Sequence, residues 1–243
     1  MNKHVSSLLF ALAIVIGSSV LGYAYLNRNK SQGSISVTGL GKTDFVSDLI
    51  VWEGQFTRSG VDQKKAYADL ESDKEKISAY LTSKGIDSNT LVFSAVESIR
   101  NSKTIYSDNG RYLGEEFTGY TLYQEIQIES KEVEKVETIS REITELLNQG
   151  VNFNSRAPRY YYTQIEDLKI EMISRATENA RLRAEKIAVN SGANLGELST
   201  AKMGIFQITG QNSNEDYSWG GVYNTSSKNK TASITMKLTY VVE

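Results

Sequence analysis

A long helix near the C-terminal end constrains the fold of this chain more than any other stretch. Ile165 to Ser191 has helical periodicity, and Gly192 follows as a residue suited to the left-handed conformation just past a helix end. Four alanines recur at every fourth position, namely Ala176, Ala180, Ala184 and Ala188. Such a smooth stripe lets a sheet or a second helix approach the helix backbone closely. The sequence therefore predicts a packed helix, which a capping box between Thr163 and Glu166 would begin.

The N-terminal segment is apolar enough for membrane targeting. Val5 to Leu26 contains no charged residue and lies between Lys3 and Arg28. That length crosses a bilayer as a helix, whereas the apolar region of a cleaved signal peptide is usually about 7 to 15 residues long. Small residues near its end would nevertheless suit a signal peptidase. We expect residues 1–33 to be either an uncleaved signal anchor or a signal peptide, each with a polar tether. Both readings export residues 34–243, which would be anchored in the inner membrane facing the periplasm, or released into the periplasm.

Composition excludes several classes of function. The 27 basic and 29 acidic side chains nearly cancel, so no electrostatic argument supports binding to nucleic acid. The chain has no cysteine, which excludes disulfides and thiolate sites. Its one histidine, His4, precedes the exported part, so that part has no histidine-based triad or histidine metal cluster. No calcium-loop motif occurs, and we expect no cofactor and no metal.

Beyond residue 33 the chain alternates between extended and helical patterns. Extended patterns cover 34–42, 46–56, 91–106, 113–129, 151–163, 198–209 and 231–241, and helical patterns cover 61–84, 133–147 and 165–191. This order predicts an α+β fold in which helices cover one face of an antiparallel or mixed sheet. The elements between residues 46 and 163 follow the split β-α-β-β-α-β order of ferredoxin-like folds. We expect one continuous core.

A glycine pair occurs in the first extended segment. Gly39-Leu40-Gly41-Lys42 superficially resembles a phosphate-binding loop, but it lacks the full glycine spacing and the Ser or Thr that would meet a metal ion. Glycines within strands mark bulges or tight packing more often than ligand sites. The pair is therefore interpreted as a bulge or a site of tight packing rather than a phosphate site.

Several short motifs resemble those of one bacterial family. They are ISVTGLGK at residues 35–42, Thr118-Gly119-Tyr120, and Ala180-Arg181-Leu182-Arg183-Ala184-Glu185 followed by Gly192. Together they resemble the SIMPL-domain family of exported proteins over about Ser34 to Glu243. The resemblance implies an exported α+β domain, association with the cell envelope, self-assembly, and in some members a link to oxidative-stress defence. It implies no catalytic residue. The chain has Ser47-Asp48 where the family commonly has Pro-Asp, which leaves the local turn open.

Aromatic residues are the candidates for an interaction surface. The polar loop from Gly210 to Lys230 contains Tyr217, Trp219 and Tyr223, and a loop of this length is usually either functional or disordered. Aromatic side chains with a polar tip are favoured at protein interfaces. Tyr161 is a further candidate, although strand propensity and core packing explain Tyr160 to Tyr162 equally well.

Three functional hypotheses follow from these features. The first is a non-enzymatic, membrane-tethered envelope protein that forms a homo-oligomer through aromatic residues and strand edges, with no further protein partner identified. The alternative is a periplasmic binding protein for an apolar or lipid-like ligand held between sheet and helices. The third is a hydrolase that acts through carboxylates or a serine. The adjacent acidic pairs, Glu115-Glu116 and Glu215-Asp216, are interpreted as solvated turns.

Overall fold

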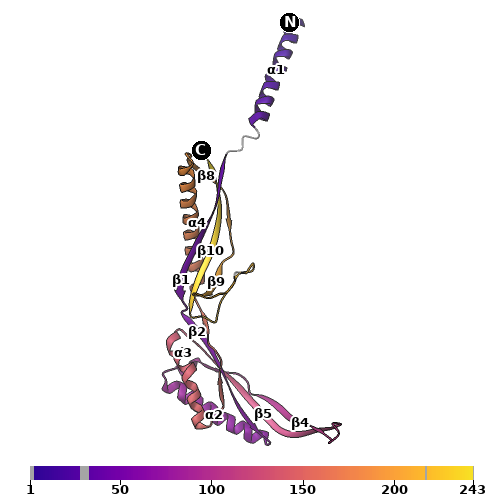
Figure 1. The fold of residues 1–243 in the computed structure, drawn as a ribbon, viewed down its shortest axis with the longest axis vertical. Coiled ribbons are helices and arrows are strands. Elements are labelled where there is room, and N and C mark those ends of the chain that lie inside the picture. The colour runs from indigo at the N-terminus through magenta and orange to yellow at the C-terminus, as the bar shows by residue number, and fades with distance from the viewer. Residues whose placement is uncertain (1–2, 28–32, 217, 243) are drawn as a thin grey trace. The chain divides into compact units, whose positions relative to one another are not determined.

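The structure is a computed structural model that describes residues 3–27, 33–216 and 218–242 (Figure 1). The chain divides into two compact units. Unit 1 comprises Met1–Leu40, Arg175–Gly204 and Thr235–Glu243, and unit 2 comprises Gly41–Ser174 and Ile205–Ile234. The expectation of one continuous core is therefore wrong. The reason is strand pairing: the extended segments on the two sides of Ser47 and Asp48 enter different sheets instead of pairing with each other.

The N-terminal helix α1 (Lys3–Asn27) agrees with the predicted apolar segment. Its residues Leu8–Leu26 form a 19-residue stretch with a mean hydropathy of 2.0, and no part of that stretch is buried against the protein. By length and composition this helix can cross a membrane.

The sheet of unit 2 is antiparallel throughout. Its strands are β2 (Leu49–Gly60), β3 (Leu91–Phe93), β4 (Glu97–Tyr106), β5 (Tyr112–Ser130), β6 (Phe153–Ser155) and β7 (Arg159–Tyr161). The central strand β2 pairs with β5 on one side and with the short strands β6 and β7 on the other, while β3 and β4 both pair with β5. The helix over residues 63–83 connects β2 to β3, which lie on the two sides of β5. The helix over residues 133–142 connects β5 to β6, which lie on the two sides of β2. This arrangement confirms the predicted split order.

Two helices cover one face of this sheet (Figure 1). They are α2 (Gln63–Ser83) and α3 (Val133–Glu142), with a 3-10 helix η1 (Ser88–Thr90) after α2 and another, η2 (Ile143–Gln149), after α3. The helical period over residues 61–84 predicts that Ala66, Leu70, Ile77 and Leu81 face inward, and all four are buried in α2. They pack with Trp52 and Phe56 of β2 in one hydrophobic core. The patterns over residues 46–56 and 133–147 placed Val46 and Leu147 inward, but both are exposed. Val46 is the last residue of the preceding strand, which ends there, and the chain at Leu147 is a 3-10 helix that buries Leu146 instead.

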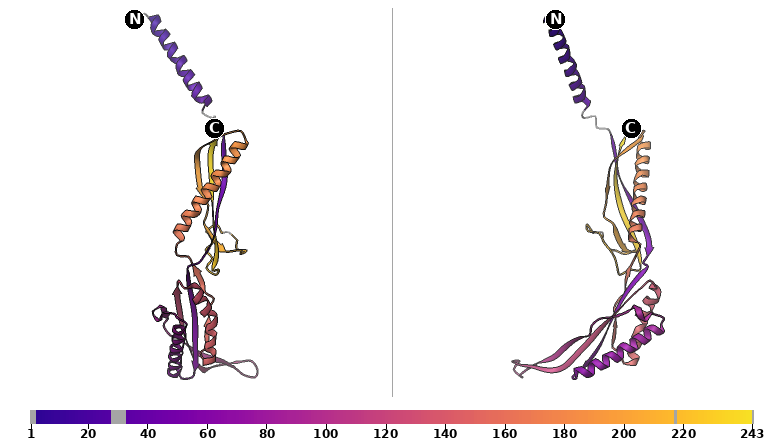
Figure 2. Two further views of the ribbon diagram at one scale, coloured as in Figure 1. Left: turned by 90° about the vertical axis from the view of Figure 1, so that its left-hand side faces the viewer. Right: turned by 180° about the vertical axis from the view of Figure 1, so that it is seen from behind.

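The second sheet has the strand order β1-β10-β8 (Figure 2), formed by β1 (Ser34–Val46), β10 (Asn229–Val242) and β8 (Leu195–Met203). Helix α4 (Ile165–Asn190) packs on this sheet, and its four stripe alanines are fully buried. A short strand, β9 (Gln207–Gly210), pairs with the beginning of β10. The predicted strand over residues 198–209 is thus interrupted before β9.

Gly39 shows how closely β1 approaches α4. A Cβ atom at this position would lie 2.0 Å from the carbonyl oxygen of Ala176 and 2.5 Å from the nitrogen of Ala180. The amide of Leu40 donates to the side chain of Asn179 at 3.2 Å. The glycine is therefore required by the contact with the alanine stripe, as the tight-packing interpretation predicted.

Tertiary contacts modify several local predictions. The dipeptide Asn109-Gly110 between two extended segments predicts a hairpin turn, which is confirmed by a φ of +75° at Gly110 between β4 and β5. Pro158 interrupts the predicted strand over residues 151–163, which leaves two short strands.

The hydroxyl of Thr163 donates to Asp48 at 2.6 Å, so the predicted capping box is wrong. The turn at Ser47 differs from one that begins with proline, because the Ser47 amide donates to Lys228 O at 3.0 Å.

Candidate interaction surface

The loop between β9 and β10 carries the most exposed aromatic side chain of the described residues. Trp219 is 96 % exposed, and Tyr223 in the same loop is half-exposed. Tyr217, the third aromatic residue predicted for this surface, lies outside the described residues. Tryptophan is enriched at protein interfaces, where its large amphipathic ring becomes covered. Trp219 is therefore the main candidate for a contact residue, and the contacts of its loop show how its side chain is kept exposed.

Hydrogen bonds from the loop's own side chains and from β9 hold the loop in place. The side chain of Gln207 in β9 donates to Ser218 O at 2.8 Å and accepts from the amide of Val222 at 2.7 Å. Glu215 accepts from the amide of Gly210 at 2.9 Å and from the side-chain amide of Asn224. The hydrogen bond from the amide of Gly210, together with those from the side chains of Asn224 and Ser213, lowers the pKa of Glu215. The solvated-turn interpretation is thus incomplete for Glu215, because this carboxylate is a structural acceptor.

A buried lysine fixes the C-terminal part of the same loop. Lys230 is 1 % exposed, and its ammonium donates to Asn224 O at 2.5 Å, to Ser227 O at 2.6 Å and to Asn224 Oδ1 at 3.3 Å. Burial lowers the pKa of Lys230 to about 8. The alternation over residues 231–241 predicts a half-buried strand with Thr231 and Ser233 on its polar face, but both residues are buried, which corrects that expectation for the start of β10. At the start of β10, β9 pairs with residues 230–233, and the loop accepts hydrogen bonds from the ammonium of Lys230.

The loop is also attached to neighbouring elements of unit 2. Tyr223 forms a parallel bridge with Ile208 of β9, and Thr225 O accepts from the amide of Tyr160 at 2.7 Å. At the loop's end Lys228 donates to Glu134 at 2.9 Å and to Glu137 at 2.7 Å, both on α3. The hydrogen bond from Lys228 lowers the pKa of Glu137. Trp219 is therefore presented by a loop that is anchored on several sides.

The three neighbouring tyrosines have separate environments. Tyr160 is buried, and burial raises its pKa. The ring of Tyr162 packs against Phe45 with a centroid distance of 4.8 Å. Tyr161, the predicted interaction residue, is half-buried and pairs with Leu49 of β2. The structure thus brings Trp219 and Tyr223 together in one loop, and hydrogen-bonds that loop to β7, the strand that contains Tyr161.

A second exposed apolar surface was not predicted from the sequence. The outer part of the β4–β5 hairpin is a two-stranded ribbon, because pairing of β5 with β2 ends at Tyr120 (Figure 1). Its exposed apolar side chains are Ile105, Tyr106, Tyr112, Leu113 and Phe117. Among the described strands β4 pairs with β5 alone, so its other edge is open. The alternation that predicts a strand does not reveal where the covering helix stops.

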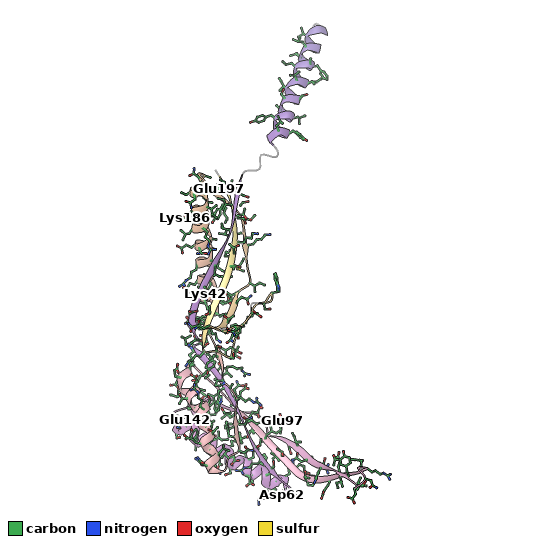
Figure 3. The ribbon with its side chains drawn as sticks, viewed as in Figure 1. Lys42, Asp62, Glu97, Glu142, Lys186 and Glu197 are labelled. Carbon is green, nitrogen blue, oxygen red and sulfur yellow. The ribbon has the colours of Figure 1, made fainter. Side chains whose placement is uncertain are left out.

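A surface hollow lies between β1 and α4 in unit 1. It has a volume of about 530 Å³ and is lined by Val37, Thr38, Asn179, Leu182, Arg183, Lys186 and Ile187. Lys186 is labelled on α4 in Figure 3. Arg183 donates to Thr38 O at 2.9 Å, which fixes its guanidinium at the edge of the hollow. The hollow combines aliphatic walls with two basic groups.

No group of three or more His, Cys, Asp or Glu side chains in the described parts of the chain is arranged to hold a metal ion. In the acidic pair of β5, Glu115 accepts from the hydroxyl of Ser102 at 2.7 Å. The features that remain are surfaces: an anchored aromatic loop, an open hairpin ribbon and a shallow amphipathic hollow.

These features define a two-unit α+β protein with an N-terminal helix that is long and apolar enough to cross a membrane. The family model of SIMPL, described as a protein of unknown function (DUF541), matches residues 35–242. The chain therefore belongs to the SIMPL family, as the sequence motifs indicated. No curated protein matches it.

Proposed function

We propose that this chain is a non-enzymatic assembly module that is exported to the cell envelope, tethered by α1, and joined to further copies of itself through the Trp219 loop. The exposure of Trp219 supports the proposal most strongly, because the loop that carries it is fixed by Gln207, Glu215 and Lys230. Because the loop is held in this way, the indole of Trp219 cannot easily pack onto the rest of the protein. Tryptophan is also enriched among residues that contribute most to binding energy.

The open edge of β4 supplies a second contact in this proposal. A strand edge with unpaired amide and carbonyl groups can pair with a strand of another chain. The ribbon of β4 and the outer part of β5 also exposes apolar groups on a structure that would be only marginally stable alone. Assembly of several copies would cover these groups. The proposal also includes a role in protection against oxidative stress. Deletion of the gene should then reduce resistance to peroxide, and unchanged resistance would contradict this role.

The assembly proposal is tested with the full chain in detergent. We expect sedimentation analysis over a range of concentrations to give a discrete oligomer, and Trp219→Ala to weaken its association constant about 30-fold, the loss typical of one central interface residue. Tyr67→Ala is the control, because Tyr67 is an exposed aromatic residue on α2. A monomer at every concentration, or equal weakening by the two variants, would contradict the proposal.

The alternative function is binding of a lipid-like ligand, and the hollow between β1 and α4 favours it. Aliphatic walls with Arg183 and Lys186 at the edge suit a ligand with an apolar body and an anionic group. Native mass spectrometry of the full chain would then show a bound amphiphile that Leu182→Glu removes. Ile170→Glu is the control, because Ile170 is exposed on the same helix and does not line the hollow. Identical spectra for both variants would exclude this site.

A further inference from the structure

Strand β8 is an uncovered edge of the sheet in unit 1. Among the described strands it pairs with β10 alone, so its other edge is open. Its residues from Glu197 to Met203 are all exposed. None of them belongs to the aromatic loop, to the β4–β5 hairpin or to the hollow between β1 and α4. An open edge can pair with a strand of another chain, and the side chains of β8 indicate which strand would fit.

The face of β8 that is level with the core of unit 1 exposes apolar side chains. Leu198 and Met203 lie opposite Tyr240 and Met236 of β10. The two β10 residues are each 8 % exposed, whereas Leu198 is 50 % and Met203 is 62 % exposed. The cover over this face of the sheet therefore ends between β10 and β8. A further strand beside β8 would extend the apolar face.

The opposite face of β8 carries two charged residues without an ion-pair partner. Lys202 lies directly opposite Lys237 of β10, and like charges in this position repel each other. Glu197, which Figure 3 labels, lies near the beginning of the same strand. Neither Glu197 nor Lys202 has a hydrogen-bond or ion-pair partner among the described residues. A carboxylate beside Lys202 would offset the repulsion from Lys237.

A register shift places both charged residues on one face. Residues five positions apart in a regular strand lie on opposite faces of the sheet. In β8, however, Thr200 pairs with Thr239 of β10 while Leu198 pairs with the very next β10 residue. This bulge gives β8 one extra residue, and the alternation of its side chains shifts by one position. Glu197 and Lys202 therefore share the face that carries Thr200.

We propose that two copies of this chain pair antiparallel through β8, about a two-fold axis that passes between their Thr200 residues. In this register Glu197 of each copy lies opposite Lys202 of the other, so both charges gain an opposite partner. On the apolar face Leu198 of each copy lies opposite Ala201 of the other. The contact is isologous and closed, because both copies use the same strand.

This dimer is compatible with tethering by α1. The two-fold axis is perpendicular to the sheet, and both N-terminal helices can enter one bilayer when that axis is normal to the membrane. The proposal shares its partner, a second copy, with the proposed function, but it rests on a different surface. All tests therefore use the full chain in detergent with Trp219→Ala, so that their outcome does not depend on assembly through the Trp219 loop.

Cross-linking tests the register. The chain has no cysteine, so Thr200→Cys introduces a single thiol. Directly opposite residues of antiparallel strands have Cα atoms about 4.5 to 5.5 Å apart, which suits a disulfide. We expect mild oxidation to link most chains of this variant into dimers. Thr239→Cys is the matched control, because three strand spacings, about 14 Å, would separate its two thiols. No cross-link, or equal cross-linking of the two variants, would overturn the proposal.

Charge reversal tests the complementarity. We expect Lys202→Glu or Glu197→Lys to weaken the association constant about 30-fold in sedimentation analysis, because each places like charges opposite each other twice in the dimer. The double variant Glu197→Lys, Lys202→Glu restores both opposite pairs and should recover most of the association. An equal mixture of the two single variants should also form dimers, each with one chain of either kind. Unchanged association of Lys202→Glu, or no recovery in the double variant and the mixture, would overturn the proposal.

Discussion

The guanidinium of Arg58 forms a two-point ion pair with the carboxylate of Asp73, with Nε–Oδ2 and Nη2–Oδ1 distances of 2.5 and 2.7 Å. Asp73 is fully buried on the inward face of α2, and Arg58 lies on β2. The same guanidinium donates to Gly150 O at 2.8 Å, at the end of η2. Asp73 raises the pKa of Arg58 through this hydrogen bond. One arginine thus links the central strand, the longer helix and the turn before β6.

Replacement of Arg58 should destabilise unit 2 strongly. Arg58→Met leaves the buried Asp73 carboxylate without its main partner, and we expect a loss of about 3 to 5 kcal/mol in the free energy of unfolding. Urea unfolding followed by the emission of Trp52, which is buried in the same core, measures this loss. The double variant Arg58→Met, Asp73→Leu removes both charges and should recover most of it. A loss below about 1 kcal/mol in the single variant would contradict this account.

Gly39→Ala should loosen unit 1. The new methyl group would overlap with backbone atoms of Ala176 and Ala180, which cannot move as a flexible side chain can. We expect a loss of at least about 2 kcal/mol and faster amide exchange in β1 and α4 than in β2. Hydrogen exchange by mass spectrometry separates these segments. Gly33→Ala is the control, because its methyl group would make an ordinary contact of 3.6 Å with Val242. Equal exchange in both variants would show that the close approach tolerates a side chain.

Titration of Lys230 should change stability at alkaline pH. Its pKa in the folded chain is about 8, below its ordinary value of 10.5, because burial disfavours the charged form. Between these values the unfolded state binds more protons, so this residue's contribution to stability rises with pH from about 8 to about 10.5. The difference in unfolding free energy between wild type and Lys230→Met should therefore shift toward the wild type by up to about 3 kcal/mol. A pH-independent difference would contradict this expectation.

Fluorescence quenching should report on the Trp219 loop directly. The chain has two tryptophans, and Trp52 is fully buried with its indole donating to Ser155 at 3.0 Å. We expect acrylamide to quench mainly Trp219 at low protein concentration, and Trp219→Phe to remove most of the quenchable emission. Quenching should decrease as the concentration rises if Trp219 becomes covered in an oligomer. Constant quenching at all concentrations would place Trp219 outside any subunit contact.

The sequence alone determined the elements whose signals are local. The alanine stripe of α4, the hairpin turn at Gly110 and the apolar helix α1 depend on neighbouring residues and on fixed backbone periods. The sequence offered tight packing as one interpretation of Gly39, but only the structure shows that its partner is the alanine stripe of α4. The candidate loop was found by its length and its aromatic residues.

Only the tertiary structure decided which segments pair and which polar groups become buried. Separation of β1 and β2 into different sheets depends on partners from the other end of the chain, such as β10. Burial of Asp73 and Lys230 depends on acceptors and donors that lie close only after folding. Asp73 shares the helical spacing of the inward residues Leu70 and Ile77, and Lys230 shares the strand alternation of Ala232. The pattern alone does not predict their burial, because a charged side chain is costly to bury without a partner. The tertiary structure supplies the partners: Arg58 for Asp73, and the carbonyl oxygens of Asn224 and Ser227 for Lys230.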